Sequence, residues 1–226
     1  MRVLVVAFLI LLIAAGAVLA EPSATGDDIQ LLLIDDFEAG LKPNWKVKSF
    51  AGETDYKVVT EQSGKVLRAE SRGTASGLVY KIDFNPSDYP LLSWRWKVAG
   101  VVAAGDERFK NGDDYAARLY VIFPHWFFPK TRTLNYIWAN RLPRDEIIPN
   151  AFTSNAMMLA VESGPQRAGQ WIEVRRNIIE DYRRAFGEEP PRAGAIAIMT
   201  DTDNTGQSAM AWYDDIYLIK RSTSAE

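Results

Sequence analysis

The sequence predicts an all-β protein, an antiparallel β-sandwich of the jelly-roll type with one short α-helix near residues 177–186. About a dozen short segments alternate apolar and polar residues with a period of two, which is typical of half-buried strands. Clusters of Gly, Pro, Asn and Asp separate these segments and indicate turns. Seven Trp, nine Tyr and ten Phe supply large side chains for a core between two sheets.

The predicted strands follow one another along most of the chain. In the segment LLSWRWKV, Trp94, Trp96 and Val98 share one face of a strand. Arg95 and Lys97 share the other face, so this strand is expected to be half buried. The predicted strands cover residues 31–37, 44–50, 55–61, 65–71, 76–84, 91–98, 115–123, 133–139, 156–163, 171–176, 195–200 and 210–220.

The predicted helix has start and stop signals at both of its ends. Asn177 is a favourable N-cap residue, and acidic residues follow it in the first turns. Gly187 suits the left-handed position that ends many helices. Pro190 and Pro191 then prevent the helix from continuing.

The chain divides into an N-terminal targeting segment and one domain. Residues 1–20 have an early arginine, an apolar run and small residues at their end, which predicts a signal peptide cleaved after Ala20. The alternative is a retained membrane anchor, but the apolar run is short for spanning a bilayer. Residues 21–29 are expected to form a flexible leader, residues 30–220 a single β-sandwich domain, and residues 221–226 a flexible tail. The mature protein is therefore expected to be periplasmic or secreted, with no stable membrane span.

Composition excludes several classes of site. The chain has no Cys, which excludes disulfides, thiolate metal sites and a lipid-modified cysteine at the cleavage site. It has one His, which excludes a zinc site built from several histidines. The net charge is −3 and no strong basic patch is visible, so no nucleic-acid partner is expected.

Two groups of acidic residues mark the ends of the predicted domain. Asp35, Asp36 and Glu38 follow the first strand, and Asp214 and Asp215 interrupt the last one. The first and last strands of a sandwich are often neighbours, and carboxylates are suitable calcium ligands. These five residues are therefore candidates for a shared structural calcium, and the alternative is simple exposure on alternate strand positions.

The segment TDTDNTG follows an apolar strand. Asp201, Asp203 and Gly206 match positions one, three and six of an EF-hand calcium loop. Position twelve should be Glu but is Trp212, and the preceding segment is strand-like, so an EF-hand is excluded. Three interpretations stay open, namely a turn held by Asp and Asn side chains, a ligand-contacting loop, and an irregular calcium loop.

The segment NGDDYAARLY places two acids at the start of a strand. Asp113 and Asp114 come directly before it, and Arg118 lies within it. Arg118 is a candidate to form a cationic groove with Arg95 and Lys97, suited to a carboxylate-bearing ligand. The alternative is a structural ion pair between Arg118 and one of the two aspartates.

His125 is the only residue on which a histidine-dependent mechanism can rest. It lies in PHWFFP, which indicates an aromatic loop that forms a binding lip, touches a membrane or packs in the interior. The sequence has no Gly-x-Ser-x-Gly elbow of a Ser-His-Asp hydrolase.

Four segments together resemble a family of exported bacterial proteins known only as a domain of unknown function. These are GDDYAARLYVIF, LNYIWAN, DYRRAFGEEPPRAGAIAIMTDTDNTG and AWYDDIYL, and the likeness runs from about Leu32 to Leu218. The resemblance implies no reaction. In architecture the chain is similar to galactose-binding-like and carbohydrate-binding jelly rolls, which implies a structural calcium between acidic first and last strands.

These observations favour a non-catalytic ligand-binding protein that recognises a glycan or a cell-envelope polymer. Trp138 is expected to stack on the ligand, so that Trp138→Ala weakens binding with little loss of folding. The alternatives are a polysaccharide lyase or hydrolase that uses Glu70 or other acids with His125, and a structural envelope protein with protein partners only. The expected site residues are Asp113, Asp114, Arg118, Asn135, Trp138, Asp201, Asp203 and Asn204.

Overall fold

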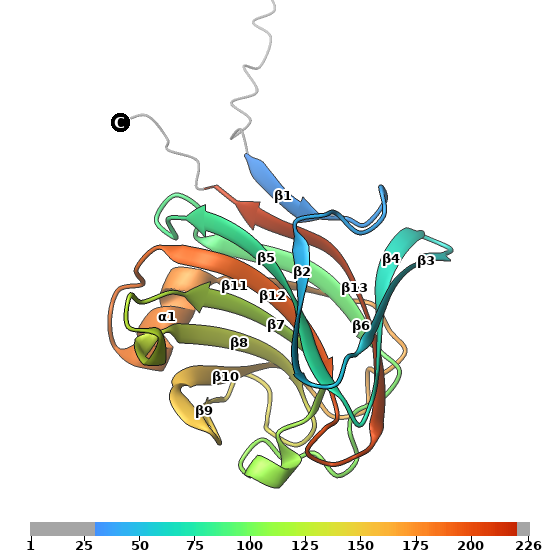
Figure 1. Ribbon diagram of the computed structural model, residues 1–226. Coiled ribbons are helices and arrows are strands. Elements are labelled where there is room, and N and C mark those ends of the chain that lie inside the picture. Colours follow the sequence, from blue (N-terminus) through green and yellow to red (C-terminus); the bar gives the residue numbers. More distant parts are fainter. Residues whose placement is uncertain (1–29, 221–226) are drawn as a thin grey trace, which may run out of the picture.

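The computed structural model describes residues 30–220, which form two β-sheets packed face to face (Figure 1). The fold class predicted from the sequence, a β-sandwich with one short helix, is confirmed. The predicted signal peptide (1–20), leader (21–29) and tail (221–226) lie outside the described residues.

Each sheet gathers strands from distant parts of the chain. The six-stranded sheet has the order β11-β6-β13-β4-β3, with β1 paired to β13. The seven-stranded sheet has the order β2-β5-β12-β7-β8-β10-β9. The first sheet contains β1 (Leu31–Asp35), β3 (Asp55–Glu61), β4 (Gly64–Arg72), β6 (Leu91–Val98), β11 (Ile172–Asn177) and β13 (Ser208–Ile219). The second contains β2 (Trp45–Ala51), β5 (Ala75–Phe84), β7 (Tyr115–Phe123), β8 (Arg132–Ala139), β9 (Ile147–Asn150), β10 (Thr153–Ser163) and β12 (Ala193–Asp201).

The seven-stranded sheet is mixed, which corrects the antiparallel prediction. β8 and β10 pair in parallel, because the chain crosses over between them through β9. The sequence predicts no strand at β9, which contains Pro149. A proline is tolerated there because β9 is the last strand of the sheet, where one side of the backbone needs no partner. Two short 3₁₀ turns, η1 (Lys110–Gly112) and η2 (Phe128–Lys130), complete the elements.

The core lies between the sheets and is rich in aromatic rings. Trp94 and Trp96 on β6 are buried, as their alternation with charged residues predicts. The ring of Trp94 lies 5.2 Å from that of Tyr136 on β8, and Trp96 lies 6.1 Å from Trp138. Ring centroids at these separations are typical of favourable aromatic pairs. These contacts join the two sheets.

The helix α1 (Ile178–Phe186) begins and ends at the predicted signals. The Asn177 side chain accepts hydrogen bonds from the backbone N–H groups of Ile179 (3.1 Å) and Glu180 (3.3 Å). Gly187 has a φ of 72°, the left-handed conformation that glycine adopts without strain. The helix packs against β8 and β11, one strand from each sheet (Figure 1).

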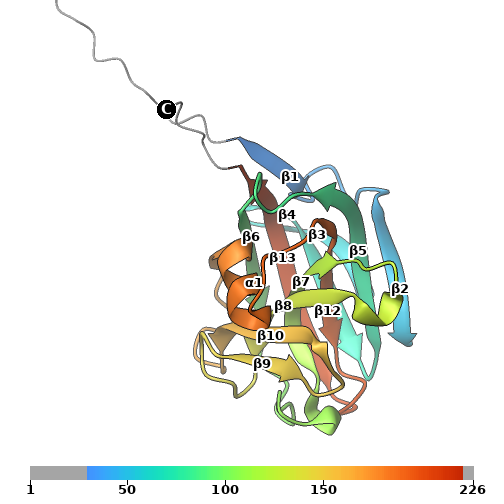
Figure 2. The same ribbon diagram turned by 90° about the vertical axis from the view of Figure 1, so that its left-hand side faces the viewer.

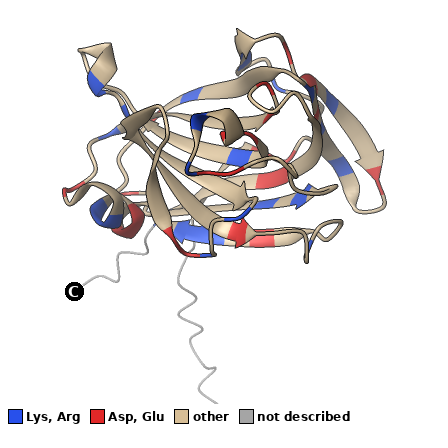
Figure 3. Ribbon diagram, turned by 90° about the horizontal axis from the view of Figure 1, so that it is seen from below, with Lys and Arg blue, Asp and Glu red and all other residues tan. Residues whose placement is uncertain are grey.

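Positive and negative side chains are interspersed over the described chain (Figure 3). Within residues 30–220, no helix is both long enough and apolar enough to cross a bilayer.

Candidate ligand-binding face

Strand register shows which residues lie on the outer face of the seven-stranded sheet, because directly opposed residues share a face. Arg118 on β7 is opposite Met199 on β12 and Ile137 on β8. Tyr120, two residues along β7, is opposite Asn135 on β8. The residues that alternate with them along β7, Ala117, Leu119 and Val121, belong to the core. Arg118, Tyr120 and Asn135 therefore lie on the outer face.

Arg118 is the centre of a buried polar network. Its guanidinium donates to Asp201 Oδ2 and to the backbone carbonyl of Asp113, and it lies 3.2 Å from the Tyr120 hydroxyl. The same group lies over the Tyr115 ring, 4.0 Å from its centroid. Only 4% of Arg118 is exposed. Arg118 is therefore held in a structural ion pair, as the alternative interpretation expected. Its main partner is Asp201, which that interpretation did not name, and the expected partner Asp113 lies 3.8 Å away.

The predicted cationic groove is wrong. Arg95 and Lys97 alternate with core residues of β6 and lie on the outer face of the six-stranded sheet. Arg118 lies on the outer face of the other sheet. The two sets of cations therefore point away from each other on opposite sides of the sandwich.

Burial and neighbouring carboxylates raise the pKa values of two acids in this network. Burial raises the pKa of Asp201 well above that of an exposed carboxyl, Arg118 opposes this rise, and Asp113 adds to it. Burial likewise raises the pKa of Asp203, and Asp114 raises it further. The cluster therefore holds more carboxyl groups than its one buried cation neutralises.

Asp114 fixes the loop that follows β12. Its carboxylate accepts hydrogen bonds from the backbone N–H groups of Asn204 (3.1 Å) and Thr205 (2.6 Å). The segment TDTDNTG is thus a turn, as one of the three interpretations expected, but the aspartate that holds it lies outside the segment. One oxygen each from Asp114, Asp201 and Asp203 also lie within 4.8 Å of one another. Calcium binding at this loop stays a prediction.

Trp138 and Asn135 do not form a ligand surface. Trp138 is 0% exposed, and its indole N–H donates to the carbonyl of Gly164 (3.0 Å). Its predicted stacking on a ligand is wrong, because its ring fills the core. Asn135 is 1% exposed and donates to Met158 Sδ (3.1 Å), so the structure places it beneath the surface as well.

The acids at the ends of the domain already have partners. β1 and β13 are neighbours, as the sequence predicts. However, Asp35 accepts from the indole N–H of Trp45 (2.7 Å). Arg95 pairs with Asp214 and lies 2.8 Å from Asp215. Asp35 and the pair Asp214–Asp215 thus each have their own hydrogen-bond or ion-pair partner.

Asp36 accepts a hydrogen bond within a local turn, and Glu38 accepts one from a residue of β4. Asp36 accepts from the backbone N–H of Glu38 (3.2 Å), and Glu38 accepts from the backbone N–H of Lys65 (3.0 Å). Within residues 30–220, the group of three carboxylates close enough to share an ion is Asp114, Asp201 and Asp203. The structure therefore gives no support to a calcium shared by the five acids at the chain ends.

Asp214 gives a pH-dependent prediction. Burial raises its pKa to about 6, although the bond from Arg95 lowers it. The unfolded value is about 3.9. The native state therefore binds more protons than the unfolded chain between these values, and the contribution of Asp214 to the free energy of unfolding falls as pH rises from 4 to 6. We therefore expect the free energy of unfolding of Asp214→Asn, taken relative to that of wild type, to rise by roughly 2 kcal/mol from pH 4 to pH 7.

The measurement is urea denaturation of both proteins at several pH values across this window. Asp88→Asn is the matched control, because Asp88 is exposed and forms no ion pair within residues 30–220. A difference in unfolding free energy that is the same at every pH would contradict the assignment.

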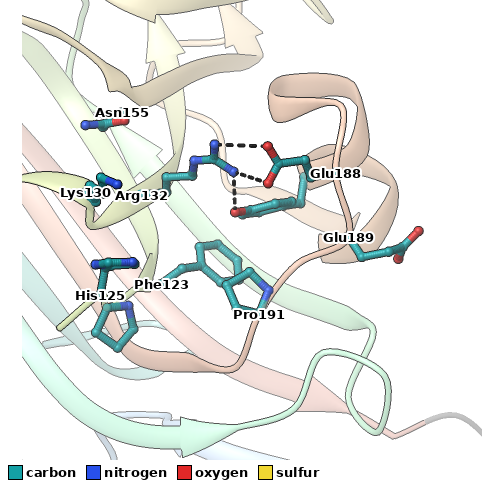
Figure 4. Close-up of a pocket in the computed structure, with 10 residues that line it drawn as sticks. Phe123, His125, Lys130, Arg132, Asn155, Glu188, Glu189 and Pro191 are labelled. Atoms are coloured by element: carbon teal, nitrogen blue, oxygen red, sulfur yellow. Dashed lines mark hydrogen bonds and ion pairs between the residues drawn. The ribbon is translucent and has the colours of Figure 1, made fainter. Parts of the chain in front are cut away.

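A pocket of about 500 Å³ lies between the β7–β8 loop (residues 124–131) and the connection from α1 to β12 (residues 187–192). Figure 4 shows that its two sides differ in charge. The side chains that give the pocket its polar character are His125, Lys130, Arg132, Asn155, Glu188 and Glu189.

Most charges of this pocket are paired. Arg132 donates to Glu188 through two bonds (2.8 and 3.3 Å) and to the Tyr182 hydroxyl (3.1 Å). The bonds from Arg132 lower the pKa of Glu188. Glu189 is bonded to Arg183 outside the pocket. Among residues 30–220, Lys130 makes no ion pair.

The loop beside the pocket exposes aromatic side chains. Trp126 is 92% exposed, and Phe127 and Phe128 are 48% and 73% exposed. Phe50 on β2 is 62% exposed, and Lys48 lies 5.1 Å from the Phe50 ring and 5.7 Å from the Phe128 ring. This contact places the loop beside β2, as Figure 2 shows. We call Phe50, Trp126, Phe127 and Phe128 the aromatic rim.

The sequence contained a signal for the aromatic rim that the site prediction did not use. Three consecutive aromatic residues cannot all face the core from a strand, because strand side chains alternate. Prolines at positions 124 and 129 further indicate a loop. No such signal marks Lys130, Asn155 or Glu188, which tertiary structure alone brings together.

Glu70 and His125 do not share a site. Glu70 alternates with core residues of β4, so it lies on the outer face of the six-stranded sheet, where it is bonded to Arg72. His125 lies in the loop that leaves β7 in the other sheet. The structure thus gives no support to the pairing of these two residues in catalysis.

Comparison with solved structures finds proteins of low similarity. A family 30 carbohydrate-binding module of a cellulosomal cellulase from Clostridium thermocellum is 12% identical, with a TM-score of 0.44 over 80% of this chain and 93% of that one. The CBM22-1 xylan-binding domain of Xyn10C from Paenibacillus barcinonensis is 13% identical, with a TM-score of 0.40 over 87% and 97%. The xyloglucanase domain of NopAA from Sinorhizobium fredii is 7% identical, with a TM-score of 0.43 over 78% and 93%. Likeness at this level says nothing about what this chain binds.

Comparison at the level of sequence is more specific. No curated protein matches the chain. One family model matches residues 43–217, from the start of β2 to near the end of β13. This match covers most of the chain. It includes three of the four segments on which the resemblance to an exported bacterial family rests, and the fourth up to Tyr217. The chain therefore belongs to the family DUF3047, described as a protein of unknown function.

Proposed function

We propose that this protein is a non-catalytic, exported binding protein whose ligand is a glycan or another polymer of the cell envelope. Export to the periplasm or the exterior is inferred from the predicted signal peptide in residues 1–20. The ligand lies on the aromatic rim and extends into the adjacent pocket.

The exposure of Trp126 is the observation that carries this proposal. An indole that is 92% exposed leaves its apolar area in water, where covering it lowers the free energy. Contiguous exposed apolar side chains mark interaction sites on soluble proteins. A pyranose ring has one face of C–H groups that packs on an aromatic ring and an edge of hydroxyls that needs polar partners.

The pocket supplies those polar partners. Its volume of about 500 Å³ is in the range of small-ligand sites and admits one or two sugar rings. Lys130 and Asn155 offer donors there, and His125 offers a ring nitrogen. The aromatic rim continues beyond the pocket to Phe50, which favours an extended polymer over a single ring.

We expect Trp126→Ala to weaken retention on polysaccharide about tenfold or more, because central aromatic anchors carry most of the energy of binding sites. The unfolding free energy should change by less than about 0.5 kcal/mol, since the side chain has almost no protein contact. The measurement is affinity electrophoresis of residues 21–226 in a panel of neutral and acidic polysaccharides.

Phe109→Ala is the matched control, because Phe109 is 58% exposed but precedes β7 at the opposite end from the β7–β8 loop. Equal retention of Trp126→Ala and wild type on polysaccharide would contradict the proposed site. Absence of retention on any polysaccharide, together with a specific protein partner from a periplasmic extract, would instead favour a structural envelope protein.

A polysaccharide lyase or hydrolase is the second candidate, since His125 shares its pocket with two glutamates. Both glutamates are bonded to arginines, which leaves neither free as an acid or base. We therefore expect wild type and His125→Ala alike to release no reducing ends from the polymers that bind. Release that depends on His125 would establish catalysis.

A further inference from the structure

A second cavity lies on the opposite side of the sandwich. It has a volume of about 690 Å³ and is bounded by the turn between β3 and β4 and by the segment before β11. Lys97 of β6 lies in its wall. The cavity thus lies over the outer face of the six-stranded sheet. The side chains that line it include Thr60, Glu61, Gln62, Ser63, Lys97 and Trp171.

Trp171 is held in a fixed orientation at this cavity. Its indole N–H donates to Glu61 Oε2 (3.3 Å). The guanidinium of Arg95 and the ammonium of Lys97 each lie 5.0 Å from its ring centroid. Trp171 is nevertheless only half buried. Its ring is therefore a preformed apolar wall, and ordering it on binding costs little entropy.

The charges of this cavity cancel. Lys97 Nζ lies 2.7 Å from both carboxylate oxygens of Glu61, so cation and anion neutralise each other. The side chains of Thr60, Gln62 and Ser63 donate or accept no hydrogen bond within residues 30–220. Two hydroxyls and one amide are thus available beside an indole ring.

We propose that this cavity is a second glycan site, and that it takes a neutral sugar ring. The indole face covers the C–H face of the ring, and Thr60, Gln62 and Ser63 bond its hydroxyls. A charged sugar is disfavoured because Lys97 is already neutralised by Glu61. This inference rests on the proposed function, since it makes the same protein bivalent for glycans.

Two sites on opposite sheets have a consequence that one site does not. The aromatic rim and the Trp171 cavity face away from each other, so one molecule can hold two polymer chains at once. One protein then cross-links chains, and retention on a dense matrix exceeds the affinity of either site.

The test uses residues 21–226 with soluble xyloglucan, galactomannan and mixed-linkage β-glucan as probes. Trp171→Ala removes the indole wall, and Gln62→Ala removes a polar partner at an exposed turn without loss of packing. Trp212→Ala is the matched control, because Trp212 is also half buried and lies 4.3 Å from Lys97 but does not line the cavity. Affinity electrophoresis measures binding, and turbidity measures cross-linking.

We expect Trp171→Ala and Trp126→Ala each to reduce retention about tenfold, and the double variant to abolish it. Wild type and Trp212→Ala should make the polymer turbid, whereas each single site variant should not. Gln62→Ala should reduce retention without changing the melting temperature.

The outcomes separate this site from the proposed one. Wild-type retention and turbidity in both Trp171→Ala and Gln62→Ala would overturn the second site. Complete loss of retention in Trp126→Ala alone would also overturn it and leave the proposed function standing. Loss in Trp171→Ala with no effect of Trp126→Ala would support the second site against the first. Retention of wild type on none of these three neutral polymers, together with retention on an acidic polysaccharide of the panel that tests the proposed function, would overturn the neutral-sugar site alone.

Discussion

Trp138→Ala is expected to lower the free energy of unfolding by about 3–5 kcal/mol, the usual range for deleting a buried aromatic ring. Trp138 is fully buried, packs 6.1 Å from Trp96 and bonds the Gly164 carbonyl. The substitution leaves a cavity between the sheets and an orphaned carbonyl. For a domain of this size, the melting temperature should fall by roughly 10 °C.

Trp126→Ala is the matched control, because it removes the same side chain from a position that is 92% exposed. Chemical denaturation of both variants separates core from surface, and retention on polysaccharide is then measured well below either melting temperature. Trp138→Ala should bind like wild type while folded. If it instead keeps wild-type stability and loses binding, the core assignment of Trp138 fails.

The sequence already contained the reason why Trp138 and Asn135 do not serve one site. Both lie in the predicted strand 133–139, three residues apart, and odd separations in a strand point to opposite faces. Tyr136 and Trp138 share the inner face, whereas Asn135 lies on the outer one. Applying the period of two within this strand excludes the joint assignment without a structure.

Local pattern predicted the elements well, because it depends on neighbouring residues. Alternation located the inward side chains of β6, and capping residues located α1 to within one residue. The parallel pairing of β8 with β10 was not predictable in this way. It depends on where the chain returns after a crossover, and no local signal records that.

The acids around Arg118 show the same limit. The sequence identified Asp113, Asp114, Arg118, Asp201 and Asp203 as a group of interest, and the structure brings them together. The sequence did not determine their role, because the partner of Arg118 lies on another strand and is set by register. Buried ion pairs and exposed ligand sites use the same residue types, and burial alone distinguishes them.

Arg118→Met is expected to destabilise the protein by about 3–5 kcal/mol at pH 7, because breaking a buried pair leaves an uncompensated charge. Asp201 is 2% exposed and loses its main cationic partner, while Asp113 remains close by. Arg175→Met on β11 is the matched control, since Arg175 is exposed and forms no ion pair within residues 30–220. Urea denaturation of both variants at pH 7 measures the difference.

The pH dependence of Arg118→Met tests the cause of this loss. Burial already raises the pKa of Asp201, and Arg118 is what lowers it, so removing Arg118 raises it further. A carboxyl whose pKa is higher in the folded state than its unfolded value of about 3.9 favours folding as pH falls between the two values. The variant should therefore regain stability relative to wild type on acidification from pH 7 to pH 4.

The double variant Arg118→Met/Asp201→Asn should be more stable than Arg118→Met at pH 7. It should also show less of this recovery, because the charge that protonation removes is already absent. A loss that is equal at both pH values and additive with Asp201→Asn would show that Arg118 acts through packing, not through its charge.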